Sequence, residues 1–293
     1  MSSTRAYAVA ALLAVADVGR AADTAPTVFL NHFYVVVDAD TYSAVQASPF
    51  LTGELAPFEK RTTQRNDTSY TGLYWYGRRT YFELFEPGAQ GPVGASGLAL
   101  GVEAPGGSAA VEQAWRKAMG AAGHGPITRK TETGEVPWFG MTYGRVIPGL
   151  RVFLMEYDRE FLARWYGALT KARSITRADV LDRYVAKVGR QREGALLEDV
   201  TGLTIALAPE SREALVKQLL AVGWTSRAEG TSVVCAGPES VELHLIEPSG
   251  GLSGITEVRF SLRRAVEAAT HKLGAAELRL DGQAARLRFR QAR

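Results

Sequence analysis

The chain of 293 residues is long enough for two domains of ordinary size, each with its own core. Hydrophobic residues make up 46% of it and charged residues 22%, a composition typical of soluble globular proteins, and the net charge is only +3. Its single cysteine, Cys235, excludes an intrachain disulfide framework and a cluster of thiolate metal ligands.

Residues 1–25 resemble a signal peptide. Arg5 precedes a mostly small and apolar run at 8–18, and residues 19–21 offer a small-x-small cleavage site. This run is too short to span a membrane, and no later segment is long and apolar enough to do so. We therefore expect a secreted or periplasmic protein without a membrane span. The alternative is a cytoplasmic protein with a disordered or helical leader.

Past residue 27 the chain repeats one order of predicted elements, namely a strand, a helix and three further strands. The first unit has a helix at 40–46 and strands at 30–37, 58–65, 70–76 and 79–86. The second unit has a helix at 108–119 and strands at 97–102, 127–133, 138–146 and 151–157. Because internal repeats of this kind determine a fold, we assign both units to one domain, residues 27–158.

A helical connector is predicted at residues 159–198. Its apolar residues recur at helical spacing in two stretches, and Thr176 with Asp179 forms a capping box that would start the second helix. The many charged side chains of the connector indicate a solvated face rather than a binding surface.

The same order of elements returns in residues 199–293, which we assign to a second domain. The third unit has a helix at 210–222 and strands at 200–207, 224–228, 232–236 and 241–246. A shortened fourth unit has a helix at 263–272 and strands at 255–260, 277–280 and 286–290. Its arginines alternate with apolar residues, which favours a strand with one solvated face over a tail that binds nucleic acid.

Two strands of the first unit carry a polar side chain inside an apolar run. His32 lies on the first strand and Glu83 on the last. Burial of either group without a partner is costly, so we expect the strands to lie side by side, with both side chains facing one cavity. The alternative is a structural role, with His32 hydrogen-bonded to its surroundings and Glu83 paired with Arg78, Arg79 or Arg145.

Paired βαβββ units with a histidine on the first strand and a glutamate on the last resemble the vicinal oxygen chelate superfamily. This group includes glyoxalases, extradiol dioxygenases, fosfomycin-resistance enzymes and bleomycin-binding proteins. The segments LNHFYVVV at 30–37 and YFELFEP at 81–87 carry the resemblance, and SYTGLYWYG at 69–77 suggests an uncharacterised glyoxalase-like subgroup. The resemblance implies an α+β fold, in which tandem βαβββ units form two glyoxalase-like half-barrel domains joined by the helical connector.

In that superfamily, the first and last strands of each unit supply the ligands of a divalent metal inside the half-barrel. The resemblance therefore implies that His32, Glu83 and Glu156 bind Fe, Mn, Ni or Zn, with Glu83 and Glu156 as catalytic carboxylates. The second unit departs from the pattern, because Ser-Gly-Leu at 96–98 stands where a further ligand is expected. We expect water to take that place; the alternative is His124, which lies in the turn predicted at 123–126.

Aromatic residues are predicted to line the same cavity. We expect Tyr34, Trp75, Tyr81 and Tyr143 to form a pocket for a flat or apolar small molecule. The predicted function is that of an exported, metal-dependent lyase, isomerase or oxygenase acting on a small oxygenated molecule. The alternatives are a metal-free protein that binds or sequesters a small molecule, as in bleomycin resistance, and a purely structural module. The superfamily also allows units to be exchanged between chains, which would give a homodimer.

The second domain offers a poorer site. His244 stands at the position that matches Glu83, and Glu242 lies on the same face two residues away. Gly202, however, stands at the position that matches His32. We interpret this domain as one that packs against the first.

Overall fold

The computed structural model describes residues 25–65, 68–132, 134–166, 175–189, 192–249 and 253–290. The predicted signal peptide, residues 1–25, lies outside the described residues except for its last position. None of the helices described is long and apolar enough to cross a membrane.

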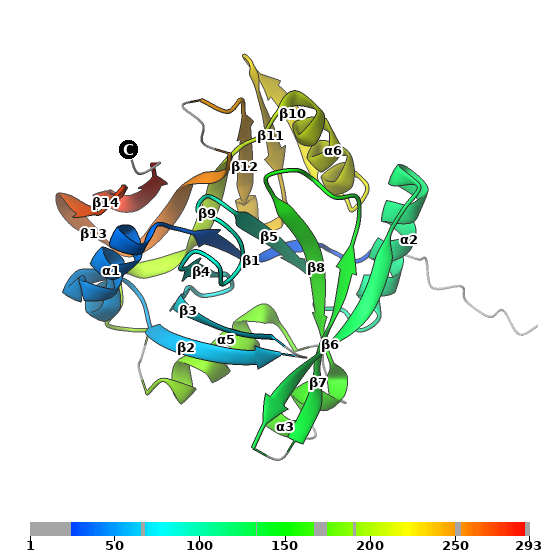
Figure 1. Ribbon diagram of the computed structural model, residues 1–293, viewed down its shortest axis with the longest axis horizontal. Coiled ribbons are helices and arrows are strands. Elements are labelled where there is room, and N and C mark those ends of the chain that lie inside the picture. The colour runs from blue at the N-terminus through cyan, green and yellow to red at the C-terminus, as the bar shows by residue number, and fades with distance from the viewer. Residues whose placement is uncertain are drawn as a thin grey trace, which may run out of the picture.

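In the described chain, eight strands form the first sheet (Figure 1). They are β1 (Phe29–Val36), β2 (Phe58–Arg65), β3 (Thr68–Tyr76), β4 (Tyr81–Phe85), β5 (Ser96–Gly101), β6 (Gly123–Thr131), β7 (Gly134–Tyr143) and β8 (Arg151–Tyr157). Their order is β2-β3-β4-β1-β5-β8-β7-β6, with β1 and β5 antiparallel at the centre. In each half the first strand pairs in parallel with the last, β1 with β4 and β5 with β8. The two predicted βαβββ units are therefore confirmed.

The helix of each unit lies between its first and second strands. α1 (Ala39–Ala47) begins after Asp38, whose carboxylate accepts a hydrogen bond of 2.8 Å from the Thr41 backbone N–H. A short π-helix, η1 (Phe50–Leu55), follows. α2 (Gly107–Met119) ends at Gly120, whose left-handed backbone conformation stops the helix.

A second sheet contains six strands of the described chain. They are β9 (Leu197–Ala206), β10 (Thr225–Glu229), β11 (Ser232–Ala236), β12 (Glu242–Ile246), β13 (Gly254–Leu273) and β14 (Ala276–Phe289). Helix α6 (Pro209–Leu220) follows β9, and the short helix η2 (Pro238–Ser240) precedes β12. In the order β10-β11-β12-β9-β13-β14, the third unit repeats the arrangement of the first, and β13 and β14 take the places of β5 and β8. The fold is α+β with tandem βαβββ units, as predicted.

The predicted helix at 263–272 is wrong, because β13 continues through these residues and pairs with β14. The hairpin turns at Gly274, whose φ of +63° suits glycine. The Ala275 backbone N–H then donates a hydrogen bond of 2.8 Å to Thr41 Oγ1, which fixes the hairpin against α1. Pairing with β14 outweighs the helix propensity of this alanine-containing stretch.

The connector contains α3 (Arg159–Tyr166) and α5 (Arg177–Lys187). The predicted capping box of Thr176 and Asp179 is present at the start of α5. Both helices place apolar side chains against the inner face of the first sheet, and Figure 1 shows α5 beside β2 and β3. Tyr184 of α5 stacks on Tyr76 of β3 with ring centres 5.8 Å apart. The connector therefore covers one end of the first half-barrel, besides presenting the solvated face that its charges indicate.

Arg177, the first residue of α5, links the connector to both sheets. It is only 4% exposed. Its guanidinium donates hydrogen bonds to the Leu30 carbonyl (2.7 Å), to Glu103 (3.2 Å) and to Glu239 (2.6 Å). Leu30 lies two residues before His32 on β1, and Glu239 lies in η2 next to the second sheet. One buried guanidinium thus ties the histidine-bearing strand to helix η2 beside the second sheet.

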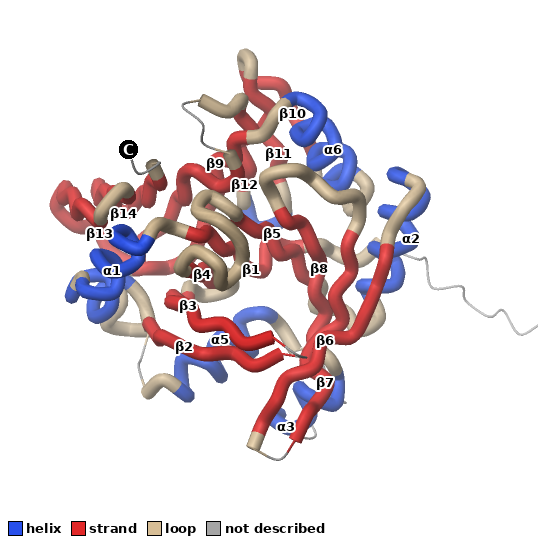
Figure 2. Tube along the Cα trace, viewed as in Figure 1, coloured by secondary structure: helices blue, strands red, loops and turns tan. Residues whose placement is uncertain are grey.

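Two apolar clusters hold the molecule together. The larger joins the outer face of the first sheet to the second sheet, where Phe82 packs on Phe260 with ring centres 5.4 Å apart. The smaller fills the inner face of the first sheet and includes side chains of α3 and α5. Figure 2 shows the strands at the centre of the view and the helices around them. Because the central strands of the first sheet are buried on both faces, most of their side chains are apolar on both sides, and buried polar residues such as His32 and Glu83 are exceptions.

Candidate functional site

His32 and Glu83 lie on neighbouring strands, as the sequence predicts. In the parallel ladder of β1 and β4, His32 is beside Tyr81 and Tyr34 is beside Glu83, so these four side chains project from the inner face. His32 Nε2 and Glu83 Oε1 are 3.9 Å apart, and both residues are buried. The two groups therefore share one buried site.

The imidazole of His32 is held neutral. Burial and, to a lesser extent, the positive charge of Arg61 together lower its pKa to about 3. Its Nδ1 lies 2.8 Å from Asn31 Oδ1, and its ring stacks on Tyr81 with centres 4.4 Å apart. Because an amide oxygen only accepts hydrogen bonds, we assign the proton to Nδ1, which leaves the Nε2 lone pair on the side of Glu83. With a neutral imidazole, the 3.9 Å contact is neither an ion pair nor a hydrogen bond.

The protonation equilibrium of Glu83 is displaced towards neutral pH. Burial raises its pKa to about 7, although the charges of Arg61 and Arg65 and a hydrogen bond from Tyr81 oppose the rise. Near pH 7 the acid and the carboxylate are therefore populated to similar extents. A carboxyl group in this state can accept a proton in one step and return it in another.

A small cavity of about 40 Å³ contains these two groups. It has room for roughly two or three water-sized atoms. The walls are largely aromatic, formed by Tyr34, Tyr70, Tyr81, Trp138, Phe139 and Phe153. Arg65 and Arg151 also line it. The cavity therefore combines an apolar wall with a few polar groups.

A wider cleft of about 810 Å³ adjoins this cavity. The side chains that line both are Tyr34, Gln90, Met141, Arg151 and Phe153. Exposed apolar side chains stand along the cleft, namely Val93, Tyr143 and Val146, the last of them 85% exposed. A volume of this size suits a small organic molecule, and apolar residues gathered on the surface are typical of a binding site.

Three of the four predicted pocket residues reach the cavity or the cleft. Tyr34 lines both, Tyr81 lines the cavity and Tyr143 lines the cleft. The prediction for Trp75 is wrong, because its side chain is buried in the core on the outer face of the sheet. There its indole N–H donates a hydrogen bond of 2.8 Å to the Leu51 carbonyl. Its neighbours along β3 point to the inner face instead.

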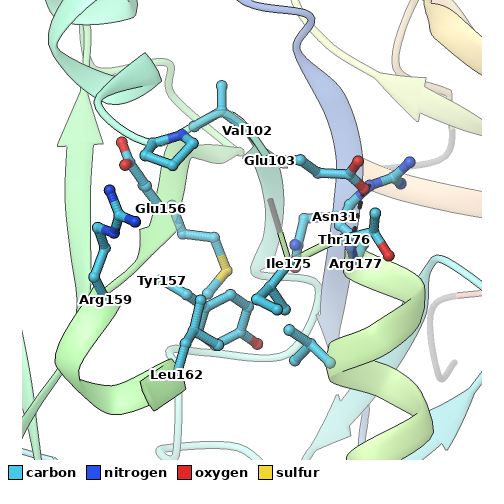
Figure 3. Close-up of a pocket in the computed structure, with 13 residues that line it drawn as sticks. Asn31, Val102, Glu103, Glu156, Tyr157, Arg159, Leu162, Ile175, Thr176 and Arg177 are labelled. Atoms are coloured by element: carbon cyan, nitrogen blue, oxygen red, sulfur yellow. Dashed lines mark hydrogen bonds and ion pairs between the residues drawn. The ribbon is translucent and has the colours of Figure 1, made fainter. Parts of the chain in front are cut away.

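The third predicted metal ligand, Glu156, lies away from the cavity. On β8, Phe153 and Met155 line the cavity, so strand alternation directs Glu156 to the other face. Its carboxylate accepts hydrogen bonds from the backbone N–H groups of Gly106 (2.6 Å) and Ser108 (2.9 Å). Figure 3 shows Glu156 beside a separate pocket, across from Asn31. Glu156 therefore caps α2, where the helix dipole favours a carboxylate.

The described residues do not supply the three-ligand metal site that the resemblance implies. Among them, no group of three or more His, Cys, Asp and Glu side chains is arranged to hold a metal ion. On β5, Ala99 lies opposite His32 and Gly97 lies opposite Tyr34, so this strand offers no ligand. A side chain at Gly97 would collide with the ring of Tyr34, which explains the glycine. His32 and Glu83 remain as the two donors of the cavity.

The residue pair singled out in the second domain lies in a half-buried ion-pair cluster. His244 Nε2 is 3.2 Å from Glu242 Oε2, and Glu242 Oε1 is 3.0 Å from Arg227. At Gly202, the guanidinium of Arg259 occupies the space where a side chain would stand. These side chains are engaged with one another, so this arrangement is typical of a structural cluster of charges.

Arg65, Trp138 and Arg151 also line the cavity, and the sequence pattern does not single out the two arginines. Trp138 is the extra residue of a β-bulge in β7, where the ladder shifts between Ile127 and Thr128. The bulge brings Trp138 onto the cavity, and a bulge leaves no periodic signal in a sequence. The two arginines lie at strand ends, where the sequence offers no contrast with ordinary solvated residues.

Glu156→Ala should lower the free energy of unfolding by about 1 kcal/mol, because two backbone N–H groups of α2 lose their acceptor. Urea denaturation measures the change. Glu156→Gln retains one acceptor oxygen and should lose less. Since Glu156 lies away from the cavity, the pH titration of Glu83 should be unchanged in both variants. Loss of ligand binding at full stability would contradict the capping role.

The model of a family described as "Family of unknown function (DUF5829)" matches residues 30–289. No curated protein matches the chain. Among solved structures, a hypothetical protein from Staphylococcus aureus is 11% identical, with 84% of this chain and 96% of that chain covered at a TM-score of 0.54. This likeness concerns the fold.

Two further solved structures are similar at lower TM-scores. The Mn(II)-bound glyoxalase from Novosphingobium aromaticivorans is 9% identical, with 87% of this chain and 78% of that chain covered at a TM-score of 0.44. A catechol 2,3-dioxygenase is 12% identical, with 86% and 88% covered at a TM-score of 0.44. These values are too low to assign an activity, so the function has to come from the site.

Proposed function

Since the chain belongs to the DUF5829 family, whose function is unknown, we propose a function from the site itself. The protein binds a small organic molecule in the cleft and exchanges a proton with it through Glu83. The reaction belongs to the isomerase or lyase class and starts at an acidic C–H or O–H bond. The proposal retains the expected small-molecule ligand without requiring the expected set of three metal ligands.

The protonation equilibrium of Glu83 and the location of its carboxyl group are the main support for this function. Its carboxyl group has a pKa of about 7 and lies in a cavity that adjoins the cleft. General acid–base catalysis is most effective when the pKa of the catalytic group is close to the working pH. A strongly shifted carboxyl group beside a cleft is a typical mark of a functional site.

In the proposed reaction, the cleft binds the apolar body of the ligand and directs its reacting atom into the cavity. The ionised form of Glu83 removes a proton from that atom, and the protonated form returns it to a neighbouring atom or to a leaving group. His32 Nε2 accepts a hydrogen bond from a hydroxyl group of the ligand, while Asn31 holds the ring in position. The aromatic wall limits access of water.

Hydrogen exchange in D2O tests the proposal. Phenylacetone and phenylpyruvate are incubated with the full chain, and NMR follows the loss of their acidic C–H signals. Exchange of at least one of them should accelerate as the pH rises through about 7, because Glu83 ionises there. Glu83→Gln should reduce the catalysed rate at least tenfold, whereas Glu86→Gln, at an exposed position just past β4, should not.

Equal exchange in the wild type and in Glu83→Gln would contradict a proton-transfer role. Binding of a ligand without any catalysed exchange would instead support the metal-free binding or sequestering protein of the bleomycin-resistance type. In that case the cleft keeps its role, and Glu83 serves only as a polar contact.

One observation favours a second candidate, the metal-dependent lyase, isomerase or oxygenase. The Nε2 lone pair of His32 and the Glu83 carboxyl group face each other across 3.9 Å, so a divalent ion could take both as ligands. Elemental analysis after exposure of the full chain to Fe, Mn, Ni or Zn separates the candidates. About one equivalent of metal that is lost in His32→Ala and retained in Glu156→Ala would favour the metal enzyme.

A further inference from the structure

We propose that the ligand of the cleft is an organic acid, whose anionic group is bound by Arg65 and Arg151 and whose second acceptor atom takes the indole N–H of Trp138. This inference rests on the proposed function, because it names the class of molecule that the same site binds. The charges, the unpaired donor and the shape of the site each support it.

Arg65 and Arg151 line the cavity, where Arg151 is hydrogen-bonded to the Tyr34 hydroxyl and the charge of Arg65 acts on Glu83. Neither forms an ion pair with a carboxylate of the residues that the structure describes. Two arginines that do not line the cavity differ: Arg61 is paired with Glu59 at 2.5 Å, and the buried Arg177 with Glu239 at 2.6 Å. Guanidinium groups bind carboxylates and phosphates through paired N–H donors. Arg65 and Arg151 are therefore available for an anion that comes from outside the chain.

The indole N–H of Trp138 is a buried donor without an acceptor in the described structure. Trp138 is 6% exposed and lines the cavity. Buried N–H groups nearly always have a partner, and those that lack one call for a specific explanation. The β-bulge in β7 places this side chain at the cavity. An acceptor atom of a bound molecule supplies the missing partner.

The charged residues that line the cavity and the cleft are mainly cationic. Within the described chain they are Arg65, Arg145 and Arg151 against a single acid, Glu83. A concave surface with this balance attracts anions.

The apolar lining of the cleft indicates what the remaining part of the ligand looks like. Val93, Tyr143 and Val146 expose apolar surface along it, and the ring of Phe153 lies where it joins the cavity. The fitting ligand has an apolar body in the cleft and an anionic group near Arg65 and Arg151. Carboxylates and phosphate esters share this chemistry.

Three probes with one apolar body distinguish these cases: 3-phenylpropanoate, 3-phenylpropyl phosphate and neutral 3-phenylpropan-1-ol. Calorimetric titration of the full chain should show that at least one anion binds tenfold or more tightly than the alcohol. The anion that binds more tightly identifies carboxylate or phosphate as the natural group. The double variant Arg65→Gln and Arg151→Gln should lose this preference. Arg264→Gln, which removes an exposed charge on β13, should keep it.

Trp138→Phe should weaken binding of the preferred anion at least threefold, because the ligand loses one donor. The wild type provides a check that needs no variant: binding of the anion should weaken with added salt, whereas binding of the alcohol should not. Equal affinity for the anions and the alcohol would overturn the inference and leave the proposed function standing. Failure of all three probes to bind would overturn both.

Discussion

Glu83→Gln should raise the free energy of unfolding at pH 8 by about 3 kcal/mol. In the folded protein the carboxyl group has a pKa of about 7, whereas its ordinary value is 4.5. Between these values the folded state binds more protons than the unfolded state. The stability of the wild type therefore falls as the pH rises through this window. Glutamine resembles the protonated acid and does not ionise, so the variant avoids this loss.

Urea denaturation at a series of pH values measures the difference. The two proteins should be similarly stable at pH 4 and should diverge up to pH 8. His32 acts in the opposite sense: its pKa of about 3 lies below the ordinary 6.5, so both proteins lose stability as the pH falls from 6.5 towards 3. Glu86→Gln should remain within about 0.5 kcal/mol of the wild type. Parallel pH curves for the wild type and Glu83→Gln would contradict the burial of Glu83.

Arg177→Ala should lower the free energy of unfolding by about 3 kcal/mol, because removal of one member of a buried ion-pair network leaves its partners uncompensated. Glu103 loses its cation, Glu239 keeps only Arg79, and the Leu30 carbonyl loses a donor. The free energy of unfolding from urea titrations at pH 7 measures the loss.

The control for this prediction lies on the same helix. Arg183→Ala also removes an arginine from α5, but at an exposed position, and should change stability by no more than about 0.5 kcal/mol. Arg177→Lys keeps the charge without the planar set of donors and should recover only part of the loss. A decrease of less than about 1 kcal/mol for Arg177→Ala would show that the network does not stabilise the packing of α5 between the two sheets.

Much of the first half-barrel could be predicted from the order of elements and from two misplaced polar residues. The repeated strand–helix–strands order gave both βαβββ units of the first sheet and the third unit in the second. The cost of burying His32 and Glu83 unpaired correctly predicted that β1 and β4 are neighbours, because a buried polar group restricts where its strand can lie.

The errors arose where strand alternation carries no contrast. β8 is apolar on both faces, since one face lines the cavity and the other joins the core between the sheets. Its hydrophobic pattern therefore could not show that Phe153, rather than Glu156, points inward. Trp75 was misplaced for the same reason, because its strand is aromatic on both sides. The helix expected at 263–272 failed differently: local propensity was overridden by pairing with β14, a contact distant from the segment itself.

The connector makes the first half-barrel dependent on the sequence that follows it. Tyr184 covers Tyr76 on the inner wall, and Arg177 holds the carbonyl of Leu30. A fragment that ends after β8 would keep every strand of the first sheet but would expose its aromatic inner face to solvent. Exposed apolar surface of this kind promotes self-association. Attempts to excise, shuffle or fuse this half-barrel therefore have to carry α5 and its anchor along. We therefore expect that a fragment able to fold by itself has to include α5 in addition to the eight strands of the first sheet.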